Sequence, residues 1–304
     1  MHKKTHGFTN NLPRFAVLLA SFNGMKYIEN QIDSIVKQVC VDVTIFVSDD
    51  FSIDGTWEWL QNNRSQNIKL LSRTTKFGSA GANFFRLIND VSLEKFDYVA
   101  FCDQDDIWFE DKLIRAVNAI EEYSCNAYSS NVTAFWPDGN EVLINKAQPL
   151  KKWDYFFEAA GPGCTYVLQS NVVKMLAQAI NKNLAAVKRI ELHDWLIYAW
   201  IRSHNLKWFI DPVPSMNYRQ HSNNVVGVNN GVAAAKVRLA KMLNGWYSKQ
   251  ILLIASVIDM ADSQPACWIR NPTFMNKIKL LKSTSSCRRR FRDQLAFLVY
   301  VIAL

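Results

Sequence analysis

The sequence lacks the segments that mark a secreted or a membrane-spanning protein. No stretch supplies the roughly 20 consecutive apolar residues that a membrane-spanning helix needs. The first apolar run, residues 15–20, follows a polar start and is too short for a signal peptide. Six cysteines are spread along the chain without a Cys-x-x-Cys pair. This spacing argues against a zinc site and favours reduced thiols in a cytoplasmic protein.

Three common motifs of nucleotide and acyl chemistry are also missing. The chain has no phosphate-binding loop of the Gly-x-x-x-x-Gly-Lys type, no Gly-x-Gly-x-x-Gly after its first expected strand, and no Gly-x-Ser-x-Gly elbow. Internal repeats and low-complexity linkers are absent as well. Any nucleotide chemistry must therefore rest on another arrangement of residues.

Basic charge is scarce outside the last quarter of the chain. The 304 residues include 35 Lys and Arg against 27 Asp and Glu, but residues 231–304 hold 12 of the basic and only 3 of the acidic ones. The rest of the chain, with 23 basic and 24 acidic residues, has no basic stripe. We therefore expect no nucleic-acid partner, and we expect the basic segment to determine where the protein sits.

The first hundred residues contain an alternation of strand and helix patterns. Short β-branched and aromatic runs alternate with segments whose apolar residues recur at helical spacing. We expect strands over residues 15–20, 43–47, 68–71 and 98–102. This order predicts an α/β fold of Rossmann-like type, with a mostly parallel central sheet flanked by helices.

Beyond residue 108 the pattern becomes mixed. We expect helices over residues 112–123, 171–180 and 193–202, a hairpin from 127–135 and 141–144, and strands over 164–168 and 207–210. From Ala233 onward the pattern is helical and basic, and it closes with ten uncharged residues, 295–304. We predict an α/β domain over residues 1–230 and a helical, basic extension over residues 231–304.

The stretch Tyr98-Val-Ala-Phe-Cys-Asp-Gln-Asp-Asp-Ile-Trp108 is the strongest functional signal. A buried strand ends there in three carboxylates, Asp103, Asp105 and Asp106. The carboxyl ends of strands are where open α/β sheets bind ligands. Crowded like charges favour a bound cation, and hard oxygen ligands suit Mg²⁺ or Mn²⁺ carrying substrate phosphates. A solvated acidic turn is the alternative.

A second acidic loop follows the strand over residues 43–47. It contains Asp49, Asp50 and Asp54, and it can face the same crevice because both strands belong to one sheet. An Asp there can accept a hydrogen bond from the N3–H of uracil or thymine, or from ribose hydroxyls. The alternative is a helix N-cap, which is the reading that we favour for Asp54.

Two further segments carry groups suited to this chemistry. Asp194 opens a helix, where it is either a dipole-stabilised cap or a general base toward a hydroxyl. The loop at residues 218–224 includes Arg219, which could hold a diphosphate, and His221, which could complete a metal shell or simply be exposed.

Together these segments resemble a known family. Five segments occur in a fixed order along the chain: Ala20-Ser-Phe-Asn-Gly24, Asp49-Asp-Phe-Ser-Ile-Asp-Gly-Thr56, Cys102-Asp-Gln-Asp-Asp-Ile-Trp108, His193-Asp-Trp195 and Arg219-Gln-His221. The set resembles family 2 glycosyltransferases of the GT-A fold over residues 14–227. The form Asp-Gln-Asp-Asp-Ile-Trp, with Arg-Gln-His-Ser-Asn-Asn behind it, is most similar to bacterial rhamnosyltransferases of O-antigen and polysaccharide biosynthesis.

The resemblance implies a role for each matching residue. Asp194 would be the catalytic base, and Asp103, Asp105 and His221 would hold Mg²⁺ or Mn²⁺ on the donor diphosphate. The acceptor would lie against Gly163, Cys164 and Trp195. The expected donor-binding residues are Ser21, Asn23, Asp49, Asp50, Asp54, Asp103, Gln104 and Arg219. Phe51-Ser52 departs from the Gly-Ser that is common in the family, and Phe51 is expected to narrow the nucleobase pocket.

The implied reaction is an inverting transfer of a sugar, L-rhamnose from dTDP-L-rhamnose, to a hydroxyl of a lipid-linked glycan. A UDP-hexose donor is the alternative within the family, and a nucleotide-sugar-binding module without turnover is the alternative outside it. Because such acceptors are carried on lipids, we expect the protein on the inner face of the cell membrane. The basic tail, including Arg288 and Arg289, is expected to attract anionic lipid.

Overall fold

The computed structural model describes residues 12–63, 66–221, 240 and 244–304. The predicted domain boundary at residue 230, the start of the helical pattern at Ala233 and the polar residues Ser222, Asn223 and Asn224 lie outside these ranges.

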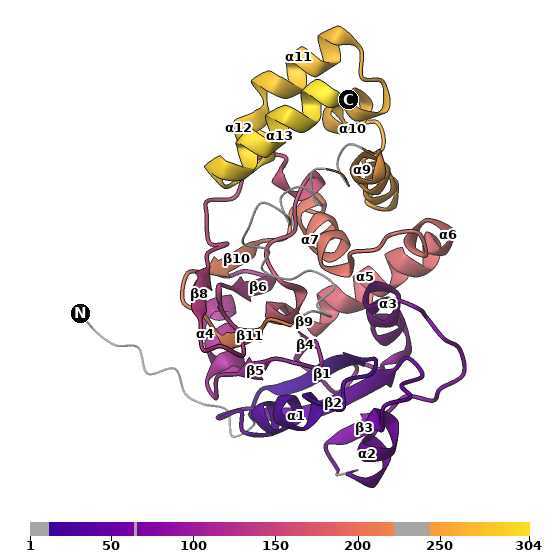
Figure 1. Cartoon of the computed structure of the whole chain (residues 1–304), viewed down its shortest axis with the longest axis vertical. Coiled ribbons are helices and arrows are strands. Elements are labelled where there is room, and N and C mark those ends of the chain that lie inside the picture. The colour runs from indigo at the N-terminus through magenta and orange to yellow at the C-terminus, as the bar shows by residue number, and fades with distance from the viewer. Residues whose placement is uncertain (1–11, 64–65, 222–239, 241–243) are drawn as a thin grey trace, which may run out of the picture.

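A seven-stranded sheet with the order β10-β6-β9-β4-β1-β2-β3 forms the centre of the molecule (Figure 1). Its strands are β1 (Arg14–Ser21), β2 (Asp42–Asp49), β3 (Ile68–Leu70), β4 (Tyr98–Cys102), β6 (Ala127–Ser130), β9 (Val167–Gln169) and β10 (Trp208–Asp211). Only β9 runs antiparallel to its neighbours, and the other pairs are parallel. The expected mostly parallel sheet is confirmed.

Helices cover both faces of this sheet. In β1, Phe15, Val17 and Leu19 pack with α1 (Ile28–Val36), α2 (Thr56–Asn62) and α4 (Lys112–Glu122). Ala16 and Leu18 face the opposite core, which contains α3 (Ala80–Asp90), α5 (Ser170–Lys182), α6 (Leu184–Val187) and α7 (His193–Ser203). The side chains of a strand alternate between the two faces of its sheet, so one strand serves two cores.

A smaller sheet lies beside the carboxyl end of β4. Its order is β5-β11-β7-β8, with β5 (Ile107–Trp108), β11 (Met216–Arg219), β7 (Val132–Phe135) and β8 (Glu141–Ile144). The antiparallel pair of β7 and β8 confirms the expected hairpin for residues 132–135 and 141–144. Residues 127–130, expected in its first arm, instead form β6 of the larger sheet. The antiparallel pair of β5 and β11 brings the segment after Arg219 back to the acidic loop after β4.

The strand expected over residues 164–168 is partly wrong. Residues Gly163–Thr165 form a 3-10 helix, η2, and the strand β9 begins only at Val167. The turn is closed because Thr165 donates its amide and its hydroxyl to the carbonyl of Pro162. In addition, the buried Lys112 Nζ donates to the carbonyl of Cys164 at 2.7 Å, which removes this carbonyl from any strand ladder.

The described part of the C-terminal segment is helical, as expected. It contains α9 (Trp246–Val257), α10 (Gln264–Arg270), α11 (Phe274–Lys282), α12 (Thr284–Cys287) and α13 (Phe291–Ala303), which lie beyond α7 at the end of the molecule remote from β3 (Figure 1). Ile251, Ile254 and Phe297 belong to the same core as Phe157 and Trp195. The helices therefore pack as a continuation of the catalytic part. No helix among the described residues is long and apolar enough to cross a bilayer.

Candidate active site

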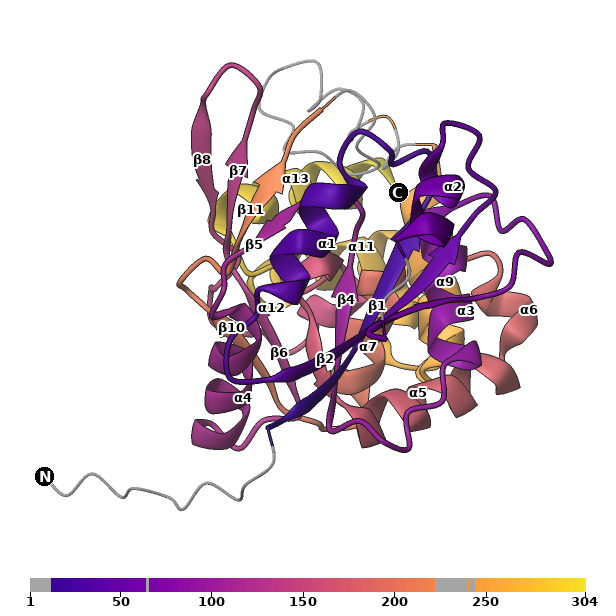
Figure 2. The ribbon, with the colours of Figure 1, turned by 90° about the horizontal axis from the view of Figure 1, so that it is seen from below.

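The loops after β1, β2 and β4 lie together at the carboxyl ends of these three neighbouring parallel strands (Figure 2). The first two loops are joined by hydrogen bonds. Asn23 donates its amide to Ser52 Oγ at 2.8 Å and accepts from the Ile53 amide at 2.9 Å. Gly24 donates to Thr56 Oγ1 at 2.9 Å. Asn23 thus holds the two loops together, which fixes the crevice where a donor was expected.

Asp49 and Asp50 are both buried and already engaged. Asp49 accepts hydrogen bonds from Ser21 Oγ and the Ser52 amide, and its carboxylate lies 3.2 Å from Arg73 Nε. Asp50 accepts from two consecutive backbone amides, those of Phe77 and Gly78, at 2.6 and 2.7 Å. Both carboxylates therefore hold loops in place: Asp49 the loop after β2, and Asp50 the loop before α3.

Arg73 is a residue that sequence reasoning missed, because nothing in a polar loop after β3 distinguishes a single arginine. Its guanidinium stacks between the rings of Phe51 and Trp57, at 4.7 and 4.8 Å, while its Nε pairs with Asp49. Phe51 adopts a left-handed conformation with φ 63°, which is uncommon for an aromatic residue. The departure from Gly at this position therefore creates a packed Phe–Arg–Trp group beside Asp49.

Asp54 connects the two loops instead of occupying the helix cap itself. Its carboxylate accepts from the Met25 amide at 3.0 Å and from the Thr56 amide at 3.1 Å. The cap position of α2 is Gly55, which has φ 95°. The prediction that Asp54 is the cap residue is wrong by one position, because the left-handed turn there favours glycine.

Gln104 joins the acidic loop to the loop after β1. Its side-chain amide accepts from the Phe22 amide at 2.8 Å and donates to the Phe22 carbonyl at 3.0 Å. A Cβ at Gly24 would lie 2.3 Å from Gln104 Oε1, so only glycine fits there. Gln104 therefore acts on the expected donor side by positioning Phe22 and Gly24.

Asp103, Asp106 and Cys164 form the densest cluster of potential metal ligands among the described residues. One ligand atom from each lies within 4.8 Å of the others. Burial, together with the charges of Asp105 and Asp194, raises the pKa of Asp103 to about 7. Burial, together with the charges of Asp105 and Asp103, raises the pKa of Asp106, whose Oδ2 has no hydrogen-bond partner. A divalent cation would relieve this repulsion, so the residues fit a metal.

Asp105 and His221 meet directly beside this cluster. His221 Nε2 lies 2.7 Å from Asp105 Oδ2, and its ring stacks on Tyr27 at 5.1 Å. Arg219 donates its amide to Asp106 Oδ1 at 3.0 Å and its Nε to the Asp105 carbonyl at 2.8 Å. Residues more than a hundred positions apart in sequence are thus brought together as predicted.

Lys112 is a second residue that sequence reasoning missed. It is fully buried in α4, where its ammonium lies 4.1 Å from the centre of the Trp108 ring and bonds to the Cys164 carbonyl. Burial lowers the pKa of Lys112 to about 8, and the charges of Asp106 and Asp103 oppose this effect. Lys112 begins the expected helix, and its charge lies next to the acidic cluster.

Asp194 lies in the first turn of α7, close to the acidic cluster. Burial raises the pKa of Asp194 to about 6, and the Trp195 amide and the charge of Lys146 oppose this effect. A Cβ at Gly163 would lie 2.7 Å from His193 Nε2 and 3.1 Å from Asp194 Cβ. Gly163 is therefore required by the close approach of η2 to α7, which sets Asp194 against the expected acceptor stretch.

Trp195 does not line an open site. Its side chain is 3% exposed, its indole N–H donates to the Tyr155 carbonyl at 3.0 Å, and its ring stacks on Tyr247. This placement corrects the expectation that Trp195 contacts the acceptor, because the indole is satisfied within the core. Cys164 is also fully buried, within the group that it forms with Asp103 and Asp106, so its side chain does not face an acceptor either.

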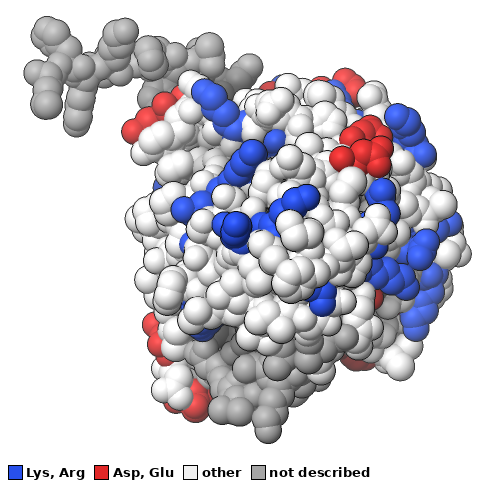
Figure 3. All heavy atoms as spheres, turned by 90° about the horizontal axis from the view of Figure 1, so that it is seen from above, with Lys and Arg blue, Asp and Glu red and all other residues white. Residues whose placement is uncertain are grey.

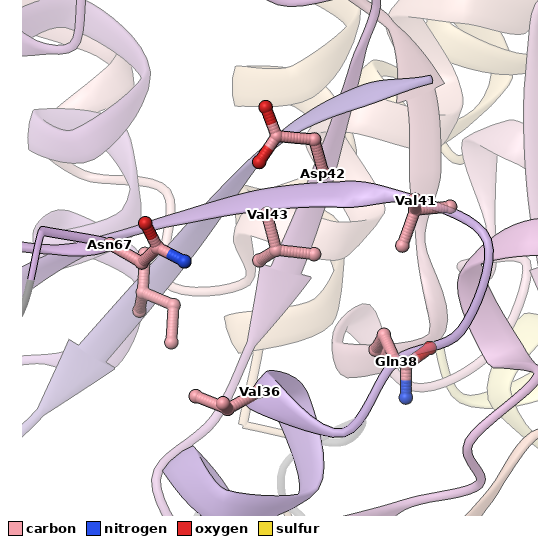
Figure 4. A pocket seen from close by; sticks show the side chains of 7 residues that line it. Val36, Gln38, Val41, Asp42, Val43 and Asn67 are labelled. Carbon is pink, nitrogen blue, oxygen red and sulfur yellow. The ribbon is translucent and has the colours of Figure 1, made fainter. Parts of the chain in front are cut away.

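A cavity elsewhere in the molecule is unrelated to these residues. It has a volume of about 100 Å³ and is lined by Gln38, Asp42, Val43 and Asn67 together with Val36, Val41 and Ile45 (Figure 4). Asp42 begins β2, so the cavity lies at the edge of the sheet opposite to the acidic loops. The candidate site is the group of polar side chains at the carboxyl ends of β1, β2 and β4.

Comparison with known proteins agrees with this assignment. Residues 16–162 match the family model "Glycosyl transferase family 2". The dTDP-rhamnosyl transferase RfbG of Shigella flexneri is 42% identical over 287 residues, which cover 93% of this chain and 99% of that protein. The Escherichia coli UDP-Glc:alpha-D-GlcNAc-diphosphoundecaprenol beta-1,3-glucosyltransferase WfaP is 26% identical over 106 residues, covering 35% of this chain and 41% of that one.

Solved structures share the fold at low sequence identity. The mannosyltransferase PcManGT from Pyrobaculum calidifontis, in complex with GDP-Man and Mn²⁺, has a TM-score of 0.51 and 15% identity over 97% of this chain and 86% of that one. S. aureus TarS 1-349 in complex with UDP-GlcNAc has a TM-score of 0.53 and 14% identity over 94% and 81%.

Proposed function

The chain belongs to glycosyltransferase family 2 and has its GT-A fold, and we propose that it transfers L-rhamnose from dTDP-L-rhamnose to a hydroxyl of a lipid-linked glycan in O-antigen or capsule synthesis. The observation that supports this proposal most is the 42% identity to a dTDP-rhamnosyl transferase over 93% of the chain. A UDP-hexose donor is less well supported, because the relative WfaP matches only 35% of the chain.

The acidic cluster is proposed to hold Mg²⁺ or Mn²⁺ through Asp103, Asp105 and His221, with Asp106 as a further ligand. Ligand atoms of Asp103, Asp106 and Cys164 lie within 4.8 Å of one another, and Asp106 Oδ2 is buried without a hydrogen-bond partner. His221 Nε2 lies 2.7 Å from Asp105 Oδ2 in the same loop. A bound divalent ion would neutralise the charge that develops on the departing nucleoside diphosphate. Arg219, which lies against the Asp105 carbonyl, is placed to support the same diphosphate.

Asp194 is proposed to remove the proton from the acceptor hydroxyl. Its pKa of about 6 leaves it mainly ionised at neutral pH but basic enough to accept a proton. The acceptor oxygen then attacks the anomeric carbon from the face opposite to the diphosphate. The reaction is a single displacement with inversion and without a covalent sugar–enzyme intermediate. Proton removal by a positioned base contributes on the order of 10²–10⁴ in rate.

The Asp194→Asn variant tests this assignment. It should bind dTDP-L-rhamnose with wild-type affinity in the presence of Mn²⁺ and lose transfer to a short-chain N-acetylglucosamine diphospholipid by several orders of magnitude. Asn keeps the size of the side chain and an oxygen that can accept from the Trp195 amide, as Asp194 does at 2.8 Å. Near-normal turnover would show that Asp194 only caps the helix. Donor binding without any turnover by the wild type would favour a binding module.

We propose in addition that the protein works at the inner face of the cell membrane, through the surface of α11 and α13. Figure 3, which looks onto these C-terminal helices, shows many Lys and Arg side chains on a face with few acidic ones. Large apolar side chains are exposed on the same helices: Phe274, Met275, Phe291, Leu295, Val299 and Ile302. Basic and apolar side chains together suit adsorption to an anionic bilayer.

The structure corrects the list of basic residues for this contact. Arg289 is buried and Arg288 is largely buried, and both are paired with Glu158. They are therefore not available to lipid. Lys279, Lys282 and Arg292 remain exposed, and Lys277 and Arg290 are partly exposed.

Sedimentation with phosphatidylglycerol vesicles tests the membrane proposal. The triple variant Phe274→Ser, Phe291→Ser, Ile302→Ser should lose most of its binding, because these are the most exposed apolar side chains of the two helices. Val36→Ser, Met175→Ser, Leu184→Ser is the matched control, since it removes three exposed apolar side chains from the catalytic part. Equal binding by both variants would remove α11 and α13 from the contact.

A further inference from the structure

We propose that Arg289 is a positioning residue for the acceptor side of the site, which fixes residues 157–161 and thereby the place of Gly163 beside Asp194. The inference rests on the proposed function, in which the acceptor lies against Gly163. It assigns a role in transfer to a residue that follows Gly163 by 126 positions in the sequence.

The guanidinium of Arg289 binds the backbone just before the acceptor stretch. Nη2 donates to the carbonyls of Ala159 and Ala160 at 2.6 and 3.1 Å. The Arg289 amide donates to Glu158 Oε1 at 2.7 Å. The side chain is wholly buried, so water cannot replace these bonds if they are lost.

The charge of Arg289 is matched by acidic groups from the same region. Asp154 Oδ2 lies 3.6 Å from Nη1 and Glu158 Oε1 lies 3.7 Å from Nε. The hydroxyl of Tyr198 in α7 accepts from Nη1 at 3.0 Å and donates to Asp154 at 2.9 Å. One buried network therefore joins the end of α12, the segment before Gly161 and the helix that carries Asp194.

The preceding residue, Arg288, binds the same segment at the Phe157 carbonyl. Its Nη1 donates to the Phe157 carbonyl at 2.6 Å and to Tyr247 Oη at 3.0 Å. Tyr247, in α9, donates to the same carbonyl and stacks on Trp195. The two adjacent arginines thus fix three carbonyls, those of Phe157, Ala159 and Ala160, from the side of the C-terminal helices.

The opposite side of the segment is held by Tyr166, the residue between η2 and β9. Tyr166 Oη accepts from the Ala160 amide at 3.1 Å and donates to the Gly161 carbonyl at 3.2 Å. Between these two anchors, Pro162 leads directly into η2, where Gly163 packs against His193 and Asp194. A shift of residues 159–161 would therefore be passed to Gly163, which has no space to absorb it.

Initial-rate kinetics with dTDP-L-rhamnose and the short-chain N-acetylglucosamine diphospholipid test the proposal. Arg289→Met should raise the acceptor KM by about tenfold or more, because small misplacements beside reacting groups are costly. The donor KM should stay within about twofold, since no contact of Arg289 reaches the donor loops. Arg289→Lys should fall between Arg289→Met and the wild type. Arg14→Met, which removes an exposed ion pair with Asp97 at the amino end of β1, is the matched control and should behave as the wild type.

A second variant keeps the test decisive if Arg289→Met fails to fold. Tyr166→Phe removes the hydroxyl that binds Ala160 and Gly161 and leaves the buried charges in place, so it should raise the acceptor KM in the same direction. The inference is overturned if the folded variants keep the wild-type acceptor KM, or if donor and acceptor KM rise together. If the wild type transfers rhamnose and Asp194→Asn does not, these results refute only the role of Arg289 and leave the proposed function intact. A wild type that makes no product refutes the proposed function instead.

Discussion

Replacing Asp194 by Asn should stabilise the fold at alkaline pH while it abolishes transfer. Burial raises the pKa of Asp194 from 3.8 to about 6. The folded state therefore binds this proton more tightly than the unfolded state. The stability that the protonated Asp194 carboxyl contributes is complete below about pH 4 and is lost as the pH rises through about 6. A pKa shift of about 2 units corresponds to about 3 kcal/mol of folding free energy, which the wild type loses when Asp194 ionises. The Asn variant does not lose it, because Asn does not titrate.

Urea denaturation of both proteins without metal, at pH 4.5 and at pH 8, measures this difference. Asp194→Asn should exceed the wild type by about 2–3 kcal/mol at pH 8 and by little at pH 4.5. Asp97→Asn is the control of opposite sign, because hydrogen bonds from Arg14 lower the pKa of Asp97. That pair is exposed, so its loss should cost less than about 1 kcal/mol at pH 8. An Asp194→Asn variant no more stable than the wild type at pH 8 would refute the reasoning.

Three further predictions follow from the same contacts. The logarithm of kcat/KM should rise with pH with a slope of one and level off above about pH 6, because Asp194 must be ionised to act as a base; a profile that is flat between pH 5 and 8 contradicts this. Asp105→Asn should fold normally and lose Mn²⁺-dependent donor binding in calorimetry, whereas unchanged affinity removes Asp105 from the metal site. Truncation after Ser286 should destabilise the whole protein by at least about 3–5 kcal/mol, because it removes the buried Arg289 from Glu158 and takes Phe297 and Tyr300 out of the core; a thermal midpoint equal to that of the full chain contradicts this.

The truncation prediction changes what the tail composition suggested. A run of three arginines at residues 288–290, in a basic tail, predicts attraction to anionic lipid. The partners of Arg289, Asp154 and Glu158, lie about 130 positions earlier in the chain. Local pattern contains no information on such a pairing, and only the three-dimensional structure shows it.

The sheet and the acidic edge could be predicted because their signals are local. Alternating apolar runs place β1, β2 and β4, and the carboxylates that follow each strand must lie at one edge when the strands are parallel neighbours. The structure brings Asp105 and His221 together as the motif order indicates. Gly163 could not be placed in the same way, because its turn depends on the distant Lys112 and on His193.

Residues that act through contacts with other chain segments were the hardest to identify. Arg73 lies in a polar loop, yet it stacks between two aromatic rings and pairs with Asp49. Trp195 belongs to a motif, yet its indole is buried in the core and donates to the Tyr155 carbonyl. A motif thus predicts which segment approaches the site, whereas burial and hydrogen bonding decide which of its side chains remain available.

A competition between donors tests the central claim most directly. The wild-type protein, supplied with equal concentrations of dTDP-L-rhamnose and UDP-glucose, Mn²⁺ and the short-chain N-acetylglucosamine diphospholipid, should form a product that has gained one deoxyhexose. Mass spectrometry distinguishes this product from one that has gained a hexose. Exclusive addition of a hexose would contradict rhamnosyl transfer, and the absence of any product with either donor would contradict the proposed acceptor class.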